Sequence, residues 1–326
     1  MSAFVRNASL GVAGTQPAGP GVYERSAVAL AERRARAAEF RTRGYVVLRG
    51  LLGKAEVEAY TRHLERLSRH SRTWVNSVSA ALRGEGGRRP AWVQPDGVSQ
   101  NPEFWDLVVH PALLDAARAV LAPDVRYLPH SDLHVGFSAT RWHRDNVDRT
   151  LGEGSDWDEQ REPYRLARVA LYLQSFGESR FSLGVIPGTH RADSARPLRR
   201  AIEQEAARLS HGEEEPSGLS GHADWVRAEA GDAVIFDPRI LHSGSPINGP
   251  KYSVFLAYGV PGLHYYRHGV YYRHVRGETR YRDMPTGLVA RLREHGLYAP
   301  IVPPPGAFRA DWRGSSIAGW KGRALR

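Results

Sequence analysis

The spacing of apolar residues divides the chain into a helical N-terminal part and a strand-rich middle. Residues 24–43 and 54–70 repeat apolar side chains at helical intervals, and both segments end in basic residues, which suit a helix C-terminus. Residues 102–121 predict one or two further helices, broken near Pro111. These segments predict a helical layer on the N-terminal side of the fold.

From Pro123 onward, short apolar runs rich in β-branched residues alternate with turn residues, which is typical of strands. We therefore expect a mainly β fold with flanking helices, with its β core at about 123–262. A charged, partly helical insertion at about 191–228 interrupts this core as a lid or surface excursion. The runs that predict strands are GYVVLRGLL (44–52), VRYLP (125–129), DLHVGFS (132–138), RLARVALYLQSF (165–176), SLGVIPG (182–188), DAVIFDP (232–238) and YSVFLAYGV (252–260).

The ends of the chain differ from this pattern. Residues 1–22 are small, rich in Gly and Pro and aperiodic, so they predict a flexible arm before a single domain at 23–300. After Gly262 the chain becomes dense in Tyr, His and Arg, and a helix is predicted at 286–295. Residues 301–326 read as a Pro-containing tail.

Composition narrows the chemistry that this fold can carry. The 326 residues include no cysteine, which excludes disulfides, Cys-ligated zinc, iron–sulfur clusters and thiol nucleophiles. No apolar run is long enough to span a membrane and no signal peptide is evident, so a cytoplasmic location is expected. The formal net charge of +10 comes from scattered arginines without a helix-turn-helix, zinc-finger or RNP-like pattern, so nucleic acid is not an expected partner.

Three residues predict a metal site. His143 and Asp145 are two positions apart after a strand-like segment, and residues i and i+2 of an extended chain point to the same face. His242 ends another β segment 99 residues later. Two imidazoles and one carboxylate are the ligand set of non-haem Fe(II) oxygenases. Such a site leaves coordination positions for 2-oxoglutarate and O₂.

A cosubstrate site is predicted at the start of the last core strand. Lys251 and Ser253 share one face of the segment KYSVFLAYG, where an ammonium and a hydroxyl can bind the far carboxylate of 2-oxoglutarate. Arg168 or Arg180 on neighbouring segments are alternative ligands for this carboxylate. If Lys251 has no functional role, it is expected to lie at a solvated strand end.

The ordered motifs together resemble a known family. WHRDN at 142–146, VIPGTH at 185–190, GDAVIF at 231–236 and the later His242 resemble the phytanoyl-CoA dioxygenase-like branch of the Fe(II)/2-oxoglutarate oxygenases, over residues 38 to 260. The resemblance implies a double-stranded β-helix (a cupin-like jelly roll) with Fe(II) at His143, Asp145 and His242. It also implies that His190 lies in a turn and is not a ligand.

One position departs from the family pattern. The family usually has an arginine where this chain has Lys251, and lysine neutralises a carboxylate but cannot form the bidentate fork. We therefore expect 2-oxoglutarate to bind, with weaker affinity. The carboxylate of Asp145 argues for hydroxylation rather than halogenation, since iron halogenases of this class carry a small residue there.

The substrate is predicted only as a class. Trp142, Arg144 and Arg149 lie beside the ligands, and Arg141, Asn146 and Arg180 are candidate substrate-binding residues. Arginines with aromatic neighbours suit a small molecule with anionic groups, such as a sugar, a nucleotide or another biosynthetic intermediate. The Tyr/Arg-rich segment 264–282 folds over the barrel mouth, packs as an aromatic surface or forms a homodimer interface.

Hydroxylation is the reaction that this interpretation favours. Desaturation, epimerisation or cyclisation with the same cofactors stays open. An alternative of another class is a jelly-roll binding protein without catalysis, for which the change to Lys251 is the only support.

Overall fold

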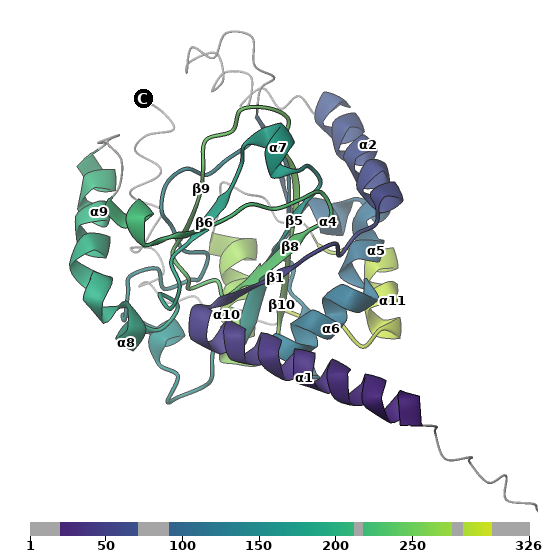
Figure 1. The fold of residues 1–326 in the computed structure, drawn as a ribbon, viewed down its shortest axis with the longest axis horizontal. Coiled ribbons are helices and arrows are strands. Elements are labelled where there is room, and N and C mark those ends of the chain that lie inside the picture. Colours follow the sequence, from purple (N-terminus) through teal and green to yellow (C-terminus); the bar gives the residue numbers. More distant parts are fainter. Residues whose placement is uncertain (1–19, 71–90, 212–217, 276–282, 302–326) are drawn as a thin grey trace, which may run out of the picture.

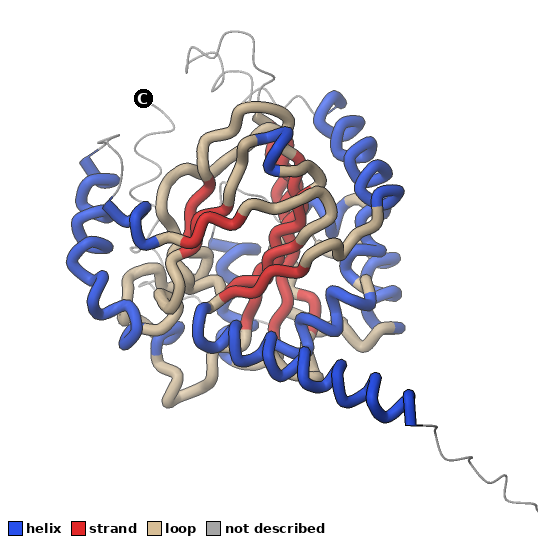
Figure 2. Tube along the Cα trace, viewed as in Figure 1, coloured by secondary structure: helices blue, strands red, loops and turns tan. Residues whose placement is uncertain are grey.

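Two antiparallel sheets form the centre of the molecule, and helices flank them (Figure 1; Figure 2). The computed structural model describes residues 20–70, 91–211, 218–275 and 283–301. The larger sheet has the strand order β1-β8-β5-β10-β4-β2, with β3 pairing to β10, and the smaller sheet has the order β7-β6-β9. The strands are β1 (Tyr45–Leu48), β2 (Trp92–Pro95), β3 (Arg126–Tyr127), β4 (Asp132–Val135), β5 (Leu166–Tyr172), β6 (Leu183–Val185), β7 (Asp224–Val226), β8 (Ala233–Phe236), β9 (His242–Gly244) and β10 (Tyr252–Gly259).

From β4 onward the chain passes back and forth between the two sheets. β4, β5, β8 and β10 belong to the larger sheet, whereas β6, β7 and β9 belong to the smaller one. The chain between β4 and β5 also reaches the smaller sheet, because His143 forms an isolated antiparallel bridge with His242 of β9. This alternation is a double-stranded β-helix, so the predicted jelly roll is confirmed.

The strand sequences explain why the sheets stack and why helices cover the outer face. β5 is buried along its whole length. Its Val169 and Leu171 pack into the cluster under the helices, and Ala170 and Tyr172 pack into the cluster between the sheets. Side chains alternate between faces along a strand, so a run of apolar residues that only Arg168 interrupts predicts a strand that is covered on both faces.

The helices that the apolar spacing predicts are present with shifted ends, whereas α4, α7 and α10 were not predicted. α1 begins at Pro20 rather than residue 24, α2 has the expected bounds, and α11 ends one residue before the predicted His295. The helical elements are α1 (Pro20–Arg43), α2 (Lys54–His70), α4 (Gly97–Gln100), η1 (Pro102–Phe104), α5 (Trp105–Val108), α6 (Pro111–Val120), η2 (Ser155–Trp157), α7 (Phe176–Ser179), α8 (Ala192–Ala195), η3 (Arg196–Leu198), α9 (Arg199–His211), η4 (Gly218–His222), α10 (Leu263–Val270), the π-helix η5 (Tyr271–Val275) and α11 (Thr286–Glu294).

The larger sheet extends beyond the predicted 123–262 core. β1 pairs with β8 and β2 pairs with β4, so segments before residue 123 supply both edge strands in the strand order of the larger sheet. The short strands β2, β7 and β9 were not predicted. Residues 1–19 of the expected arm and 302–326 of the expected tail lie outside the described residues.

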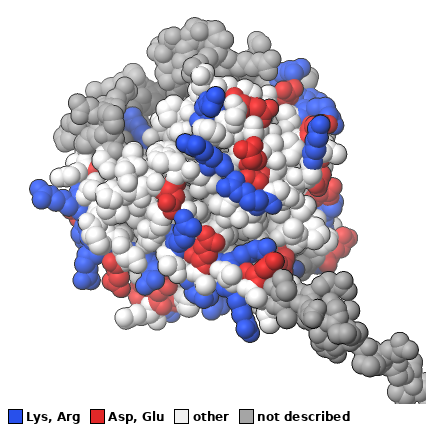
Figure 3. All heavy atoms as spheres, viewed as in Figure 1, with Lys and Arg blue, Asp and Glu red and all other residues white. Residues whose placement is uncertain are grey.

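The predicted insertion contains α8, η3, α9, η4 and β7, and in Figure 1 its helices lie on the side opposite α2 and α5. Within the described ranges, no helix combines the length and apolar character needed to cross a membrane. Lysine and arginine side chains are interspersed with acidic ones on the face in Figure 3, so this face carries no extended patch of one sign.

Candidate metal centre

The three predicted ligands converge at the edge of the smaller sheet. The backbone of His143 pairs with that of His242 through N–H to carbonyl bonds of 2.9 and 3.0 Å. Asp145 Oδ1 lies 4.0 Å from His143 Nε2, and its Oδ2 lies 3.8 Å from His242 Nε2. One ligand atom from each residue lies within 4.8 Å of the other two, an arrangement found at one place in the described part of the chain. The fold therefore brings together residues 99 positions apart in sequence.

Backbone carbonyls fix the orientation of both imidazoles. His143 Nδ1 lies 2.7 Å from the carbonyl of Arg141, and His242 Nδ1 lies 3.0 Å from the carbonyl of Ile240. A carbonyl only accepts, so each Nδ1 donates its proton, and each Nε2 keeps a lone pair directed toward Asp145. This hydrogen bond on the second ring nitrogen is typical of metal-ligating histidines.

The electrostatics favour the protonation states of metal ligands. Burial, reinforced by the nearby His143, lowers the pKa of His242 to about 3, so its imidazole is neutral at neutral pH. Burial also acts to raise the pKa of Asp145, but the neighbouring His242 and Arg168 outweigh it and hold that pKa below its ordinary value. The site thus presents two neutral nitrogens and one carboxylate. These donors fit a divalent transition metal such as Fe(II).

Asp145 is held in place from both sides. Its backbone N–H donates to the carbonyl of Pro238 at 2.8 Å, and Tyr272 donates its hydroxyl to the Asp145 carbonyl at 2.8 Å. The sequence did not single out Tyr272, which lies in the π-helix η5. Its position in the Tyr/Arg-rich segment 264–282 was the only signal in the sequence. That signal is weak, because such segments also form packing surfaces.

A second residue that the sequence did not single out, Thr189, keeps the start of β9 in place through hydrogen bonds. The hydroxyl of Thr189 donates to the Ile186 carbonyl and accepts from the backbone N–H of Leu241, the residue before His242. Its neighbour His190 is buried, with Nε2 3.1 Å from the carbonyl of Arg41. This places His190 in a structural contact, as the motif predicted.

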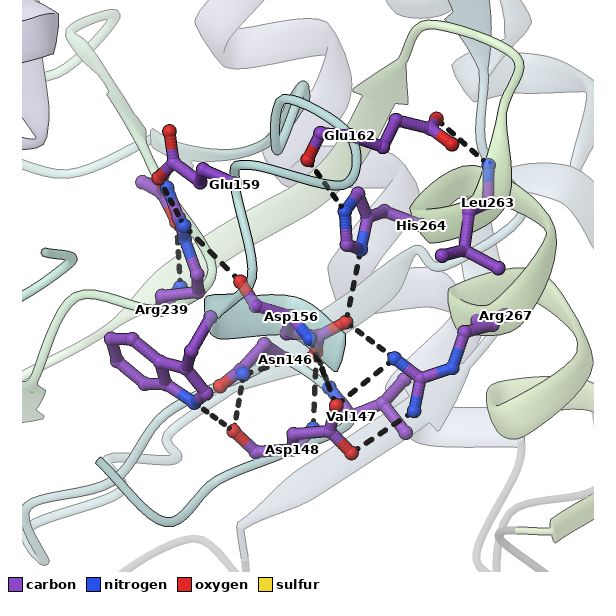
Figure 4. A network of polar contacts seen from close by, with 12 residues as sticks. Asn146, Val147, Asp148, Asp156, Glu159, Glu162, Arg239, Leu263, His264 and Arg267 are labelled. Carbon is purple, nitrogen blue, oxygen red and sulfur yellow. Dashed lines mark hydrogen bonds and ion pairs between the residues drawn. The ribbon is translucent and has the colours of Figure 1, made fainter. Parts of the chain in front are cut away.

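The segment after Asp145 is anchored by a buried network (Figure 4). Asp156 Oδ2 accepts hydrogen bonds from the backbone N–H groups of Val147 and Asp148 at 2.9 and 3.0 Å. Arg267 of α10 donates to both Asp148 and Asp156 at 2.9–3.0 Å. Burial opposes ionisation of Asp156, but His264 and Arg267 lower its pKa to about 2. The anchor is therefore ionic at neutral pH.

Asn146 lies in this network. It is fully buried, and its Nδ2 donates to Asp156 Oδ2 at 3.1 Å and to the Asp148 carbonyl. These contacts orient the chain just after Asp145. Its predicted contact with substrate stays a prediction.

Lys251 is buried beside Ser253 and is not a solvated strand end. Only 2% of its surface is exposed, and its Nζ donates to Ser253 Oγ at 3.0 Å and to the Phe137 carbonyl at 2.8 Å. Nζ also lies 4.3 Å from the centre of the Phe181 ring. Among the described residues, no carboxylate lies within 4.0 Å of this ammonium, and burial lowers its pKa to about 7.

The predicted arginines differ in their surroundings. Arg168 is buried, with its guanidinium 2.9 Å from Asp132 and 3.4 Å from Asp145. Arg180 is exposed, in a left-handed conformation (φ 56°) after α7. Arg141 is also exposed and contributes its carbonyl to His143. Of these three arginines, only Arg168 contacts a predicted metal ligand, Asp145, through its side chain.

A cavity of about 210 Å³ lies against His143, between the ligand segment and the insertion. Arg144 lines it, and burial lowers the pKa of this guanidinium to about 10 with no carboxylate opposing the shift. The other lining residues are Trp142, Arg149, Ile202, Glu205, Leu219 and Leu241.

One family model and several solved structures are similar to this chain. The family model described as phytanoyl-CoA dioxygenase (PhyH) matches residues 40–252. No curated protein matches the sequence. The similar solved structures include HygX from Streptomyces hygroscopicus with nickel and 2-oxoglutarate bound (20% identity, 71% of this chain and 88% of that chain, TM-score 0.48). Others are the α-ketoglutarate-dependent epimerase SnoN from nogalamycin biosynthesis (17%, 71% and 84%, 0.46) and EctD from S. alaskensis (21%, 69% and 76%, 0.46).

Proposed function

Since the chain belongs to the phytanoyl-CoA dioxygenase family, which uses Fe(II), 2-oxoglutarate and O₂, we propose that it hydroxylates a small organic molecule at an iron held by His143, Asp145 and His242. The observation that carries the proposal is the convergence of these three side chains, with both Nε2 atoms oriented toward the Asp145 carboxylate. When bound, Fe(II) and 2-oxoglutarate supply the oxidative decarboxylation that activates O₂ toward an unactivated C–H bond.

We propose that Lys251 and Ser253 bind the far carboxylate of 2-oxoglutarate. The ammonium has three donors, of which two are used by Ser253 and the Phe137 carbonyl. A buried cation without a carboxylate partner among the described residues is costly, and a ligand carboxylate would supply the missing charge. A lysine makes this contact as a point charge, so the expectation of weaker binding than with an arginine fork still holds.

The environments of the two alternative arginines support Lys251. Arg168 already pairs with Asp132 and Asp145, so its charge is neutralised without a ligand. Arg180 is exposed, where a single ion pair contributes little. Lys251 therefore offers the stronger anion site.

The polypeptide also keeps the predicted reaction site organised. The Arg141 and Ile240 carbonyls accept hydrogen bonds from Nδ1 of His143 and His242, respectively. Tyr272 and Pro238 form hydrogen bonds with the backbone of Asp145. A binding protein without catalysis has no need for this set, so the complete ligand group favours the enzyme. Desaturation, epimerisation and cyclisation use the same site, and product analysis separates them from hydroxylation. We further propose that the protein is cytoplasmic and forms a homodimer.

The test is anaerobic addition of Fe(II) and then 2-oxoglutarate to metal-free protein. We expect a weak visible charge-transfer band in the wild type, its loss in His143→Ala, and a weakened band in Lys251→Met. His222→Ala and Lys54→Met are matched controls, because both residues are exposed and neither belongs to the proposed iron or 2-oxoglutarate site. Iron binding without any band would reject 2-oxoglutarate as cosubstrate, and no iron binding would reject the metal centre.

A further inference from the structure

One buried arginine contacts the carboxylate of a predicted metal ligand. Arg168 of β5 is 3% exposed, and its Nε lies 3.4 Å from Asp145 Oδ2. Its Nη2 donates to Asp132 Oδ2 of β4 at 2.9 Å, and its Nη1 donates to the His130 carbonyl. β10 separates β5 from β4, and the guanidinium reaches across it, 5.6 Å from the centre of the Phe255 ring. Asp132 and Asp145 thus share one buried cation.

A cation this close to a metal ligand competes with the metal. The guanidinium and a divalent ion are attracted to the same carboxylate and repel each other. Imidazoles that bind a metal are neutral, so Asp145 and Arg168 alone carry no net charge, and Asp132 restores one negative charge to the group. Arg149 also lowers the pKa of Asp145, but less than Arg168 does. Asp132 therefore offsets the cation that lies nearest to the predicted ligand.

The segment that carries Asp132 also supports the backbone of Asp145. The His130 ring stacks on the Tyr272 ring with 3.4 Å between their centres, and the Tyr272 hydroxyl donates to the Asp145 carbonyl. Asp132 is fixed in turn by β4, where it lies opposite Phe255 of β10. Residues 130–132 thus reach Asp145 by two routes, through Arg168 to its side chain and through Tyr272 to its backbone.

We propose that Asp132 is a positioning residue of the metal centre that acts through Arg168: by holding the guanidinium, it keeps Asp145 available to a divalent metal. This inference rests on the proposed iron site and adds a residue outside the ligand set that controls the charge of that site. It predicts that removing the Asp132 carboxylate matters only while Arg168 is present. A direct attraction between Asp132 and the metal would act whether or not Arg168 is there.

The experiment is calorimetric titration of the metal-free, full-length protein with Co(II), an air-stable stand-in for Fe(II), without 2-oxoglutarate. The wild type, Asp132→Asn, Arg168→Met and the double variant form a cycle in which other charges, such as Arg149, cancel. We expect Asp132→Asn to weaken Co(II) binding about tenfold in the wild-type background and to have no effect beside Arg168→Met. Asp132→Glu keeps the charge and should bind Co(II) nearly as the wild type does. Asp124→Asn is the matched control, since Asp124 is exposed before β3.

The visible absorption of bound Co(II) separates positioning from a loss of folded protein. At saturating Co(II) the bands of Asp132→Asn should shift, because the Asp145 ligand is held differently, whereas a loss of folded protein lowers their intensity alone. If Arg168→Met does not fold, Arg168→Gln replaces it in the cycle, because glutamine keeps a donor for the His130 carbonyl.

Two results would overturn the inference. Unchanged Co(II) binding by Asp132→Asn would show that Asp132 has no influence on the site. An equal loss of affinity in both backgrounds would show that Asp132 acts on the metal directly rather than through Arg168. Either result leaves the proposed function intact, whereas a wild type that binds no Co(II) would reject the proposed metal centre itself.

Discussion

At the scale of the residue, burial of Lys251, which we propose as a 2-oxoglutarate ligand, makes the stability of the protein depend on pH. Its pKa is about 7 in the folded protein, below the ordinary value of 10.5 that we assign to the unfolded chain. Between these values the unfolded chain binds more protons, so the stability of the ligand-free protein rises as pH increases from 7 to 10. Below pH 7 the full penalty of the buried charge is present. Lys251→Met should therefore raise the unfolding free energy at pH 7 by on the order of a few kcal/mol, and this gain should vanish near pH 10.

Urea denaturation of both proteins from pH 7 to pH 10 measures this difference, because groups common to the two proteins cancel. Lys54→Met should leave the profile unchanged, since Lys54 is exposed at the start of α2. Parallel profiles for the wild type and Lys251→Met would show that the lysine is not desolvated. Added 2-oxoglutarate should reverse the order of stability at pH 7, because its carboxylate stabilises the charged ammonium.

At the scale of the element, α10 anchors the segment that follows the ligands. Arg267 of α10 forms ion pairs with Asp148 and Asp156, and Asp156 is 1% exposed (Figure 4). Arg267→Met leaves these carboxylates without their cation, so we expect a loss of about 3–5 kcal/mol in unfolding free energy. Fe(II) affinity should also fall, by about tenfold, because Asp145 precedes the anchored segment.

Chemical denaturation and Fe(II) titration of Arg267→Met measure the two effects. Arg196→Met is the control: Arg196 pairs with Asp193 at 3.6 Å, but both side chains are at least 80% exposed, and such pairs contribute little. A drop in stability with unchanged Fe(II) affinity would show that α10 supports the fold without positioning the ligands.

Periodicity explains which elements the sequence predicts. α2 and β5 carry long, regular apolar patterns, and both were found. β7 and β9 have three residues each, too few for any period to register, and β9 exists because its backbone pairs with β6 and with His143. The sequence still singled out the three side chains that converge, because His-x-Asp spacing and a later histidine reflect chemistry rather than regular structure.

Long-range pairing explains what the sequence does not predict at the site. Arg267 and Asp156 are 111 residues apart, and neither lies in a motif. Asn146 has the same neighbours in sequence whether it contacts a substrate or a buried carboxylate, so only the fold could place it in the network. The burial of Lys251 is likewise a tertiary property, because its sequence position also suits a solvated strand end.

At the scale of the whole molecule, the proposed metal centre joins parts of the chain that are far apart in sequence. His143 lies between β4 and β5, outside any regular strand, and His242 begins a three-residue strand at the end of the smaller sheet. A metal bound to both connects these segments in the folded state only. Binding should therefore stabilise the whole fold by mass action, by about 2.7 kcal/mol at a free Fe(II) concentration 100 times its dissociation constant.

Thermal unfolding under anaerobic conditions tests this coupling. Fe(II) with 2-oxoglutarate should raise the Tm of the wild type by about 4 °C, since an unfolding entropy of about 2.1 cal/mol/K per residue gives a shift of about 1.5 °C per kcal/mol for a chain of 326 residues. A chelator should return the Tm to its metal-free value. His143→Ala should show no shift with Fe(II), whereas His222→Ala should respond as the wild type does. An equal rise in His143→Ala would place the stabilising metal elsewhere and remove the link between the ligand set and the fold.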